Sequence, residues 1–287
     1  MVWDLNRGHI TRLCQAFCPD CQAPLVTCNA LREVDGLIKK VYLIAERFSK
    51  LLFILALLLV GSVYGDSTSI ELYIPDAPPL TMTDEISRHG IIGDVVLRAL
   101  AEAGYQPDVR TLPWARAQKY VGEHRDMLII PLTRTSEREG NFTWIAPIMS
   151  MERAFFSLTY QVNDFEEAKA LFRVVAVGLG SAQEEILRSN GFPEKQIYAL
   201  KIGENPAQLL LMGRVDAWFN GIPESLYIWS KISNRKLFVS PPLAKQDLYL
   251  ACSKICDPKI VLDLKRAVEK LRDDGFIEAV KKSYMGN

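Results

Sequence analysis

Residues 127–144 read Met-Leu-Ile-Ile-Pro-Leu-Thr-Arg-Thr-Ser-Glu-Arg-Glu-Gly-Asn-Phe-Thr-Trp. The apolar run 127–130 predicts a buried strand, and Pro131 ends it. Hydroxyl groups and Arg138 follow at once. In an open α/β sheet, ligands bind outside the carboxyl ends of the strands, and a guanidinium with free backbone amides suits two carboxylate oxygens. The stretch therefore predicts a carboxylate receptor. A polar surface turn with Arg138 in a salt bridge is the competing interpretation.

The composition is that of an ordinary globular protein. The chain has 287 residues, of which 49% are hydrophobic, and its 34 Lys and Arg balance its 34 Asp and Glu. Such a chain has enough apolar material for a large core. Because no basic excess exists, the composition gives no indication of a nucleic-acid partner.

The region 39–65 has the pattern of a secretory signal peptide. Basic residues precede the apolar run 51–63, and the small residues Val63 and Gly65 end the segment. The run is about 13 residues long, shorter than the ~20 that a bilayer span needs. We expect cleavage near Gly65. An uncleaved anchor is the alternative.

Residues 1–38 precede that signal and are unusual for a secreted protein. They contain four of the six cysteines, but their gaps of three, two and six residues do not form a paired zinc pattern. A signal peptide normally begins within a few residues of its basic segment. We therefore expect that 1–38 is a start-site artefact.

From residue 67 onward, strand and helix patterns alternate, and the alternation restarts near Val174. Two such runs in succession predict two α/β lobes. The expected strands are 70–74, 109–112, 127–130, 154–159, 174–177, 197–200, 217–219, 237–239 and 248–252, and the expected helices are 93–103, 115–121, 182–189, 206–212, 225–230, 260–271 and 276–284.

Several motifs occur in an order that resembles one protein family. They are Gly-Ile-Ile-Gly-Asp at 90–94, Leu-Pro-Trp-Ala-Arg-Ala at 112–117, Thr-Arg-Thr-Ser-Glu-Arg at 133–138, Phe-Thr-Trp at 142–144, Val-Gly-Leu-Gly-Ser-Ala-Gln at 177–183, Gly-Arg-Val-Asp-Ala at 213–217 and Asp-Gly at 274–275. Together they make the region 69–286 similar to the periplasmic solute-binding proteins of amino-acid ABC importers, the family 3 extracellular solute-binding proteins. Each motif alone is weakly specific.

The resemblance implies a type II periplasmic-binding-protein fold, an α/β fold with two lobes joined by two crossing strands. Lobe 1 would comprise 67–157 and 247–287, and lobe 2 would comprise 158–246. The crossings would lie near 155–159 and 245–250. Such lobes close on a ligand by hinge motion.

The resemblance also implies site residues. Arg138 matches the arginine that binds the ligand's α-carboxylate, and Thr133 matches a residue that adds a hydroxyl or amide. Ser181 matches a lobe 2 residue whose backbone amide meets the same carboxylate. Its place after a glycine, at a helix start, agrees with that role.

The chain departs from the family where the ligand's ammonium is usually bound. Asn220 or Gly221 stands in place of the usual aspartate, and Asn cannot neutralise a charge. Glu224 is the nearest carboxylate, and Asp76 after the first strand is another candidate. Loop capping by Asp76 is an equal alternative. This departure argues against an ordinary α-amino acid, and a carboxylate without a nearby ammonium, or an amine that is bound differently, fits the pattern as well.

Trp114 and Arg116 lie at a strand-to-helix junction that Pro113 fixes. We expect them to supply a ligand wall and a second cation on the cleft side of lobe 1. A core Trp and a surface Arg are the alternative.

Cys252 and Cys256 are the cysteines of the mature region. Because an exported protein meets an oxidising compartment, we expect them to form a small disulfide loop. The sequence offers no third ligand beside them and no nucleophile–base pair, so it predicts no metal, no cofactor and no catalytic residue.

Three functions fit this sequence. The first is a non-catalytic, monomeric periplasmic receptor that delivers a small carboxylate-bearing solute to an inner-membrane ABC permease. The second is an enzyme, because cyclohexadienyl dehydratases resemble this family and use a carboxylic acid in the cleft; Glu224 would be that acid. A first-turn glutamate stabilised by the helix dipole is the plain alternative for Glu224. The third is a sensory partner of a membrane receptor.

Overall fold

The computed structural model describes residues 68–83 and 87–286. These residues form one compact unit. The expected signal peptide, the segment 1–38 and their cysteines lie outside the described residues.

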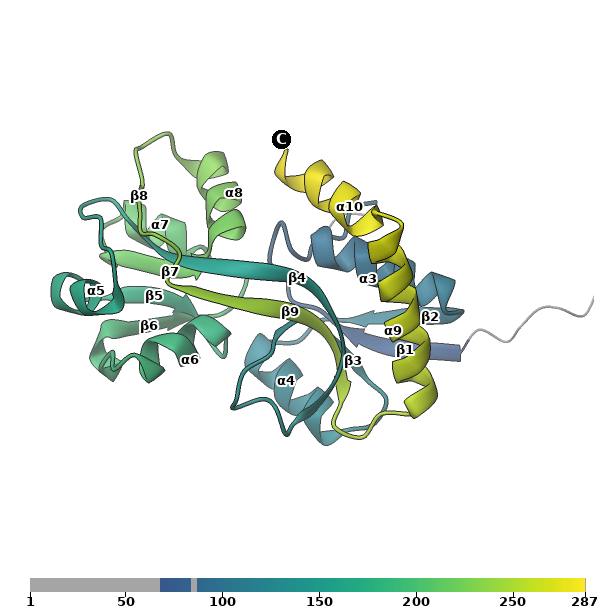
Figure 1. The fold of residues 1–287 in the computed structure, drawn as a ribbon. Coiled ribbons are helices and arrows are strands. Elements are labelled where there is room, and N and C mark those ends of the chain that lie inside the picture. Colours follow the sequence, from purple (N-terminus) through teal and green to yellow (C-terminus); the bar gives the residue numbers. More distant parts are fainter. Residues whose placement is uncertain (1–67, 84–86, 287) are drawn as a thin grey trace, which may run out of the picture. The chain divides into compact units, whose positions relative to one another are not determined.

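One mixed sheet runs through this unit in the order β2-β1-β3-β9-β4-β7-β5-β6, with β8 paired to β4 (Figure 1). The strands β1, β2 and β3 are parallel to one another, and so are β5, β6 and β7, whereas β9 and β4 run antiparallel to their neighbours. The strands are β1 (Thr68–Tyr73), β2 (Tyr105–Arg110), β3 (Leu128–Thr133), β4 (Phe142–Ser157), β5 (Val175–Gly178), β6 (Ile197–Leu200), β7 (Ala217–Gly221), β8 (Phe238–Val239) and β9 (Ala244–Ser253).

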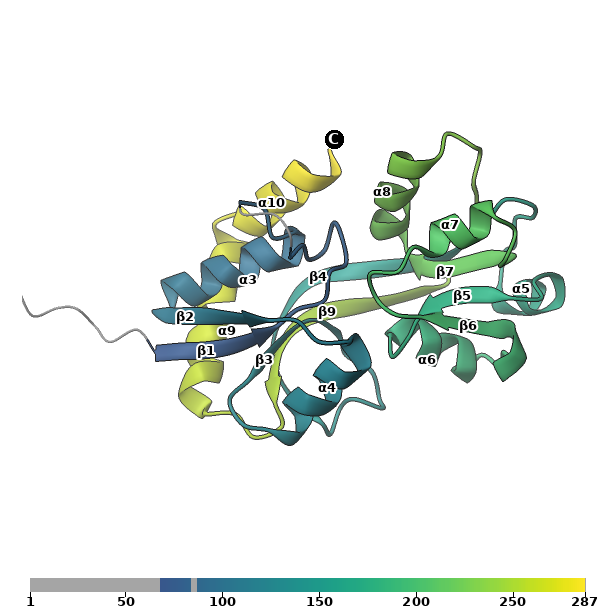
Figure 2. The same ribbon diagram turned by 180° about the vertical axis from the view of Figure 1, so that it is seen from behind.

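Helices cover both faces of the sheet in each half of the unit (Figures 1 and 2). They are α3 (Ile91–Glu102), α4 (Trp114–Glu123), α5 (Phe165–Leu171), α6 (Ala182–Ser189), α7 (Pro206–Leu211), α8 (Ile222–Ile232), α9 (Pro258–Asp273) and α10 (Phe276–Met285), with one 3-10 turn at Glu194–Gln196. In the first half, α3, α9 and α10 pack on one face and α4 on the other; in the second half, α7 and α8 oppose α5 and α6.

The sequence explains why these helices form where they do. Asn205 caps α7 by accepting a hydrogen bond from the Gln208 amide at 3.0 Å, and Pro206 occupies the first turn. Asp257 caps α9 in the same way, ahead of Pro258. On α3, the apolar residues recur every three or four positions, so one face is buried in the core.

β4 and β9 pair with each other along most of their lengths and contribute to the cores of both halves. Met149 and Met151 of β4 pack in the core under α3 and α9, whereas Phe155 and Phe156 of the same strand pack in the cores of the second half. The halves therefore form two lobes that share a two-stranded connection (Figure 2).

The observed strands differ in extent from the expected ones. β4 extends over 142–157, whereas the sequence indicated only a segment at 154–159. β2 lies at 105–110, earlier than the expected 109–112. The irregular register of β4 near Pro147 accounts for the first difference, because proline cannot donate to the sheet and concealed a continuous strand.

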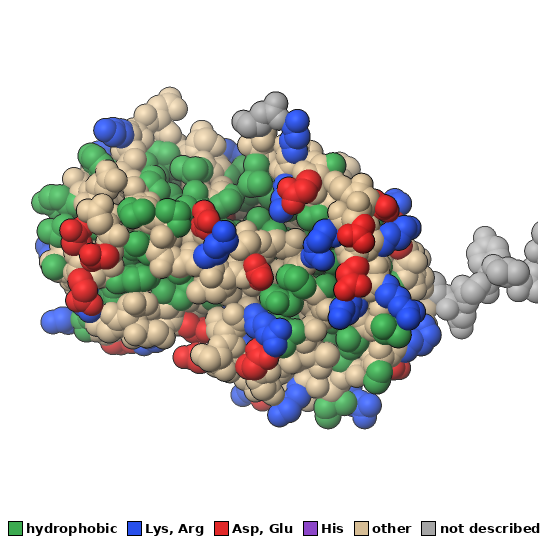
Figure 3. Space-filling model, viewed as in Figure 1, with side chains coloured by type: hydrophobic (Ala, Val, Ile, Leu, Met, Phe, Trp, Pro, Cys, Tyr) green, Lys and Arg blue, Asp and Glu red, His purple; other side chains and the backbone are tan. Residues whose placement is uncertain are grey.

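Three further observations concern the surface charges, the lengths of the helices and the disulfide. On the face drawn in Figure 3, basic and acidic side chains are intermixed rather than gathered by sign. Within residues 68–83 and 87–286, no helix has the length and apolar character needed to cross a membrane. Cys252 and Cys256 form a disulfide, as the sequence predicts, with 6.1 Å between their Cα atoms.

Candidate ligand-binding site

A small cavity lies between the lobes, where β3, β4, α4 and α6 approach one another. Its volume is about 60 Å³, and both lobes line it. We call it the inner cavity. The polar and aromatic side chains that line it include Trp114, Thr133, Arg138, Arg153, Ser181 and Glu224. It thus brings together four predicted ligand-binding residues, Trp114, Thr133, Arg138 and Ser181, and also Glu224, which the sequence offered as an alternative carboxylate. Arg138 and Thr133 come from the opening stretch.

Arg138 is buried, with only 6% of its surface exposed, and both Nη atoms of its guanidinium contact protein groups. It donates to the Thr133 carbonyl at 3.1 Å and to the Gly180 carbonyl of lobe 2 at 3.1 Å. It also forms an ion pair with Glu185 of α6. Burial lowers the pKa of Arg138, and Glu185 opposes that shift. The sequence predicts that the Arg138 guanidinium is free to bind a ligand carboxylate. In the structure it is occupied by a carboxylate of the protein itself.

Arg153 is a second buried cation, which the sequence analysis did not find. It lies on β4 and is 1% exposed. Its Nη2 donates to the Thr133 hydroxyl at 2.9 Å, and its Nη1 donates to Met151 O and Gln246 Oε1. Its Nε is buried and has no hydrogen-bond partner among the residues that the structure describes. Burial lowers the pKa of Arg153 to about 10, although the charge of Glu224 opposes this shift.

A signal for Arg153 does exist in the sequence. Along β4, Arg153 is in phase with Met151 and Phe155, which are both buried. A charged residue at an inward position of a strand is rare, because burying a charge is costly unless something compensates it. This position therefore marks Arg153 as a candidate site residue.

Glu224 is the acidic member of the site. It lies in the first turn of α8 and lines both the inner cavity and a larger one beside it. Burial raises the pKa of Glu224 to about 7, against a hydrogen bond from Asn220 and the charge of Arg153. The helix dipole, which usually stabilises a carboxylate in the first helical turn, does not offset the effect of burial here. Glu224 therefore changes protonation near neutral pH.

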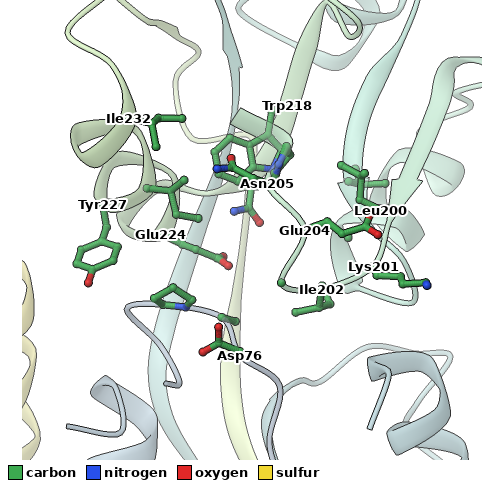
Figure 4. Close-up of a pocket in the computed structure, with 18 of the residues that line it drawn as sticks. Asp76, Leu200, Lys201, Ile202, Glu204, Asn205, Trp218, Glu224, Tyr227 and Ile232 are labelled. Carbon is green, nitrogen blue, oxygen red and sulfur yellow. The ribbon is translucent and has the colours of Figure 1, made fainter. Parts of the chain in front are cut away.

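The larger cavity, which we call the outer cavity, has a volume of about 270 Å³ and lies mostly against lobe 2. Trp218, Leu200 and Ile228 form apolar parts of its wall. Figure 4 shows the Glu224 carboxylate directed into it from α8 and Asp76 approaching from the loop after β1. A solute with a small anionic group and a larger apolar part would fit the two cavities together.

The other predicted residues lie as follows. Asn220 is buried at the end of β7, where its Oδ1 accepts a hydrogen bond from Gln183 Nε2 at 2.6 Å. Ser181 caps α6 through its hydroxyl, and its backbone amide donates to Gly178 O at 3.1 Å. The amide expected to meet a carboxylate is therefore already engaged. Trp114 is 7% exposed and forms part of the inner cavity wall.

Three predicted residues do not line the inner cavity: Asn220, which lines the outer cavity, Asp76 and Arg116. Asp76 is exposed and borders the outer cavity, where its carboxylate accepts a hydrogen bond from the Thr83 amide at 3.3 Å. Arg116 is exposed on α4 and lines neither cavity. The preceding residue, Ala115, faces Gly180 of lobe 2. Because neighbouring residues of a helix point in different directions, Arg116 is directed away from Gly180.

Among residues 68–83 and 87–286, no group of three or more His, Cys, Asp or Glu side chains is placed to hold a metal ion.

Comparisons with known proteins identify the fold. The chain matches no family model and no curated protein. Among solved structures, it is similar to the arginine-, lysine-, histidine-binding protein ArtJ from Geobacillus stearothermophilus, with 15% identity, 77% of this chain and 96% of that chain covered, and a TM-score of 0.67. The chain has a two-lobed periplasmic-binding-protein fold.

Two further structures show how widely this fold is used. An ancestral amino-acid-binding protein, described as a precursor of cyclohexadienyl dehydratase, is 18% identical, with 76% of this chain and 95% of that chain covered and a TM-score of 0.66. A histidine kinase sensor domain is 18% identical, with 77% and 96% covered and a TM-score of 0.67. At such identities the likeness establishes the type II two-lobed fold, and the role of this chain must be argued from its own residues.

Proposed function

We propose that this protein is a non-catalytic receptor that binds a small, amino-acid-like carboxylate between its lobes. One observation carries the proposal: the inner cavity joins Arg153, a buried cation without an ion-pair partner in the described residues, to Glu224 from the opposite lobe. A carboxylate would neutralise Arg153, and an ammonium would pair with ionised Glu224. Glu224 would then replace the aspartate that the sequence lacks.

The wider role follows from the resemblance and the sequence. We propose that the protein is exported through a signal peptide that ends near Gly65, acts in the periplasm as a monomer, and hands its solute to an ABC permease. The similar structures support binding of amino-acid-like solutes, because ArtJ and the ancestral precursor are both described as amino-acid-binding. Purification of the permease with the closed, solute-loaded receptor would test the transport role, and association with a histidine kinase instead would favour sensing.

A thermal-shift screen tests the binding function. The purified protein is heated with amino acids, amines, keto acids and dicarboxylates. A solute at 100 times its dissociation constant adds about 2.7 kcal/mol of stability. We expect stabilisation by at least one amino acid and a smaller effect of the matching amine, which lacks the carboxylate. Stabilisation by keto acids alone would show that Glu224 does not bind an ammonium, and no stabilisation by any carboxylate would contradict the proposal.

A dehydratase is the second candidate, and the pKa of Glu224 favours it. A protonated Glu224 in the cavity has a proton to give near neutral pH. With prephenate, cleavage of the bond to the ring carboxylate would release CO₂ and aromatise the ring. The ring hydroxyl would leave as water with the Glu224 proton, and solvent would reprotonate Glu224. Turnover of prephenate or arogenate by the purified protein, lost in Glu224→Gln, would establish this activity.

A further inference from the structure

Two buried arginines border the inner cavity, and they differ in what holds them. Arg138 contacts both lobes: the Thr133 carbonyl in lobe 1, and Glu185 and the Gly180 carbonyl in lobe 2. Its side chain is neutralised by the Glu185 carboxylate. Because all these partners belong to the protein, Arg138 already has the interactions that a solute carboxylate would offer.

The contact around Arg138 is a junction between the lobes. Gln118 of α4 also donates to the Gly180 carbonyl, at 2.8 Å. Gly180 itself lies so close to Ala115 that a Cβ atom built on it would be 2.9 Å from the Ala115 Cβ. We call Gln118, Arg138, Gly180 and Glu185 the lobe latch. It joins α4 and the 133–138 turn to the start of α6 with hydrogen bonds and one ion pair.

Arg153 is different because its partners are neutral. The Thr133 hydroxyl, the Met151 carbonyl and the Gln246 amide oxygen accept from its Nη atoms, and its Nε has no acceptor. In the described residues it forms no ion pair, although Glu224 is near enough to affect its pKa. A buried charge held only by neutral groups is unfavourable. An anion in the inner cavity would relieve that cost.

We propose that the two arginines have separate tasks: Arg138 fastens the lobes through Glu185 and Gly180, and Arg153 receives the anionic group of the solute. The inference rests on the proposed function in taking that group to be a carboxylate. It reverses the expectation from the sequence, in which Arg138 binds the solute. Thr133 serves both tasks, since its carbonyl accepts from Arg138 and its hydroxyl accepts from Arg153.

The opposing explanation is that Glu185 only substitutes for an absent solute carboxylate on Arg138. The two explanations differ in the behaviour of Glu185→Gln. If Glu185 is a competitor, this variant binds carboxylates more tightly and Arg138→Met binds none. If Glu185 and Arg138 form a latch, both variants have the same effect: they open the empty protein and leave the anion receptor in place.

Acetate is a suitable probe because it contains a carboxylate and little else, and so suits a cavity of about 60 Å³. The melting temperature of the purified protein is measured in sodium acetate and in sodium chloride of equal ionic strength. The variants are Arg153→Met, Arg138→Met and Glu185→Gln. Glu152→Gln is the matched control, because Glu152 neighbours Arg153 on β4 but forms only an exposed pair with Lys245.

We expect acetate to stabilise the wild type, Arg138→Met, Glu185→Gln and the control, and Arg153→Met to lose this response. If Arg153→Met does not fold, Arg153→Gln, which retains a donor for Thr133, takes its place. A wild type that responds equally to acetate and chloride would overturn the receptor role of Arg153. So would a response that disappears in Arg138→Met and grows in Glu185→Gln.

Small-angle X-ray scattering of the empty proteins tests the latch without any ligand. Arg138→Met and Glu185→Gln are expected to have a larger radius of gyration than the wild type and the control. Unchanged radii in both variants would overturn the latch. Failure of the proposed function is distinguishable, because in that case acetate would bind through Arg153 while the amino acids would not stabilise the protein.

Discussion

Arg153 is the residue on which the interpretation of this protein depends most. A buried cation without a carboxylate partner costs free energy, so its removal should not weaken the fold. We expect Arg153→Met to leave the free energy of unfolding of the empty protein within ~1 kcal/mol of the wild type or to raise it, in the direction of the ~1–4 kcal/mol gained when a whole buried ion pair is replaced by apolar residues. Urea unfolding measures this change.

Phe155, two residues after Arg153 on β4, provides the comparison for that experiment. Phe155 is buried in the core of lobe 2, and its ring contacts the rings of four other phenylalanines. Phe155→Ala should cost ~3–5 kcal/mol, as removal of a core aromatic does. If Arg153→Met were destabilised to a similar extent, Arg153 would be a structural residue of β4 rather than a binding residue kept at a cost.

Glu224 should make the stability of the protein depend on pH. Its pKa is raised from 4.5 to about 7 by burial. Between these values the folded state binds more protons than the unfolded state, so this contribution to stability is complete below pH 4.5 and is lost as pH rises through about 7. The shift corresponds to ~3 kcal/mol. The melting temperature of the wild type minus that of Glu224→Gln should therefore fall from pH 5 to pH 8.

The control for this pH series is Glu152→Gln, which removes an exposed glutamate. It should leave the slope of the wild-type curve unchanged. Parallel curves for the wild type and Glu224→Gln would contradict the prediction, because the pH dependence would then arise from other groups.

At the residue scale, the sequence placed Thr133, Arg138, Ser181 and Trp114 around one cavity but not their partners. The motif around Arg138 reveals that a guanidinium follows a strand. It does not reveal that Glu185, 47 positions later, meets it, because this contact depends on how the lobes close. The motif therefore predicts where Arg138 lies along the chain, whereas its contacts come from the tertiary structure.

At the element scale, the turn between β5 and α6 controls how closely the lobes approach. Gly180 has a φ of +68° and faces Ala115 of α4. We expect Gly180→Ala to prevent full closure, because the added methyl group meets the Ala115 Cβ at 2.9 Å. The affinity for a stabilising amino acid should fall by about tenfold or more, equivalent to ~1.4 kcal/mol. Isothermal titration calorimetry measures it.

A matched glycine separates this contact from backbone strain. Gly213 follows α7 in the same lobe, has a φ of +65°, and has nothing within 4 Å of its Cβ position. Gly213→Ala therefore introduces a similar left-handed strain of ~1 kcal/mol without touching the other lobe. Equal losses of affinity in the two variants would assign the effect to strain rather than to closure.

The elements themselves were largely accessible from the sequence, and the exceptions have physical causes. Caps such as Asn205, which precedes Pro206, predicted helix starts. In the structure the helix begins at the predicted residue. The length of β4 was not accessible, because Pro147 and polar residues interrupt its apolar pattern while β9 pairs along it regardless. Pairing with a distant strand overrides local preference in such a case.

At the scale of the whole molecule, the alternating patterns and motif order predicted the two-lobed fold, but not how its halves are coupled. β4 and β9 carry side chains into the cores of both lobes. An independent lobe would need a core that ends at its own boundary. Here the same two strands complete both cores, so neither lobe can lose its structure without exposing apolar residues of the other.

This coupling predicts cooperative unfolding of the two lobes. We expect differential scanning calorimetry to record a single transition for the region from Ser67 onward, since loss of either core removes support from β4 and β9. An amino acid at 100 times its dissociation constant adds ~2.7 kcal/mol to the free energy of unfolding. Because both lobes unfold together, the melting temperature of the entire transition should rise by about 5–10 °C. Arg153→Met should melt in one transition that the same amino acid does not move. Two separate transitions, with only one displaced by the amino acid, would show that the solute is held by a single lobe and that the connecting strands act as a linker rather than as a common core.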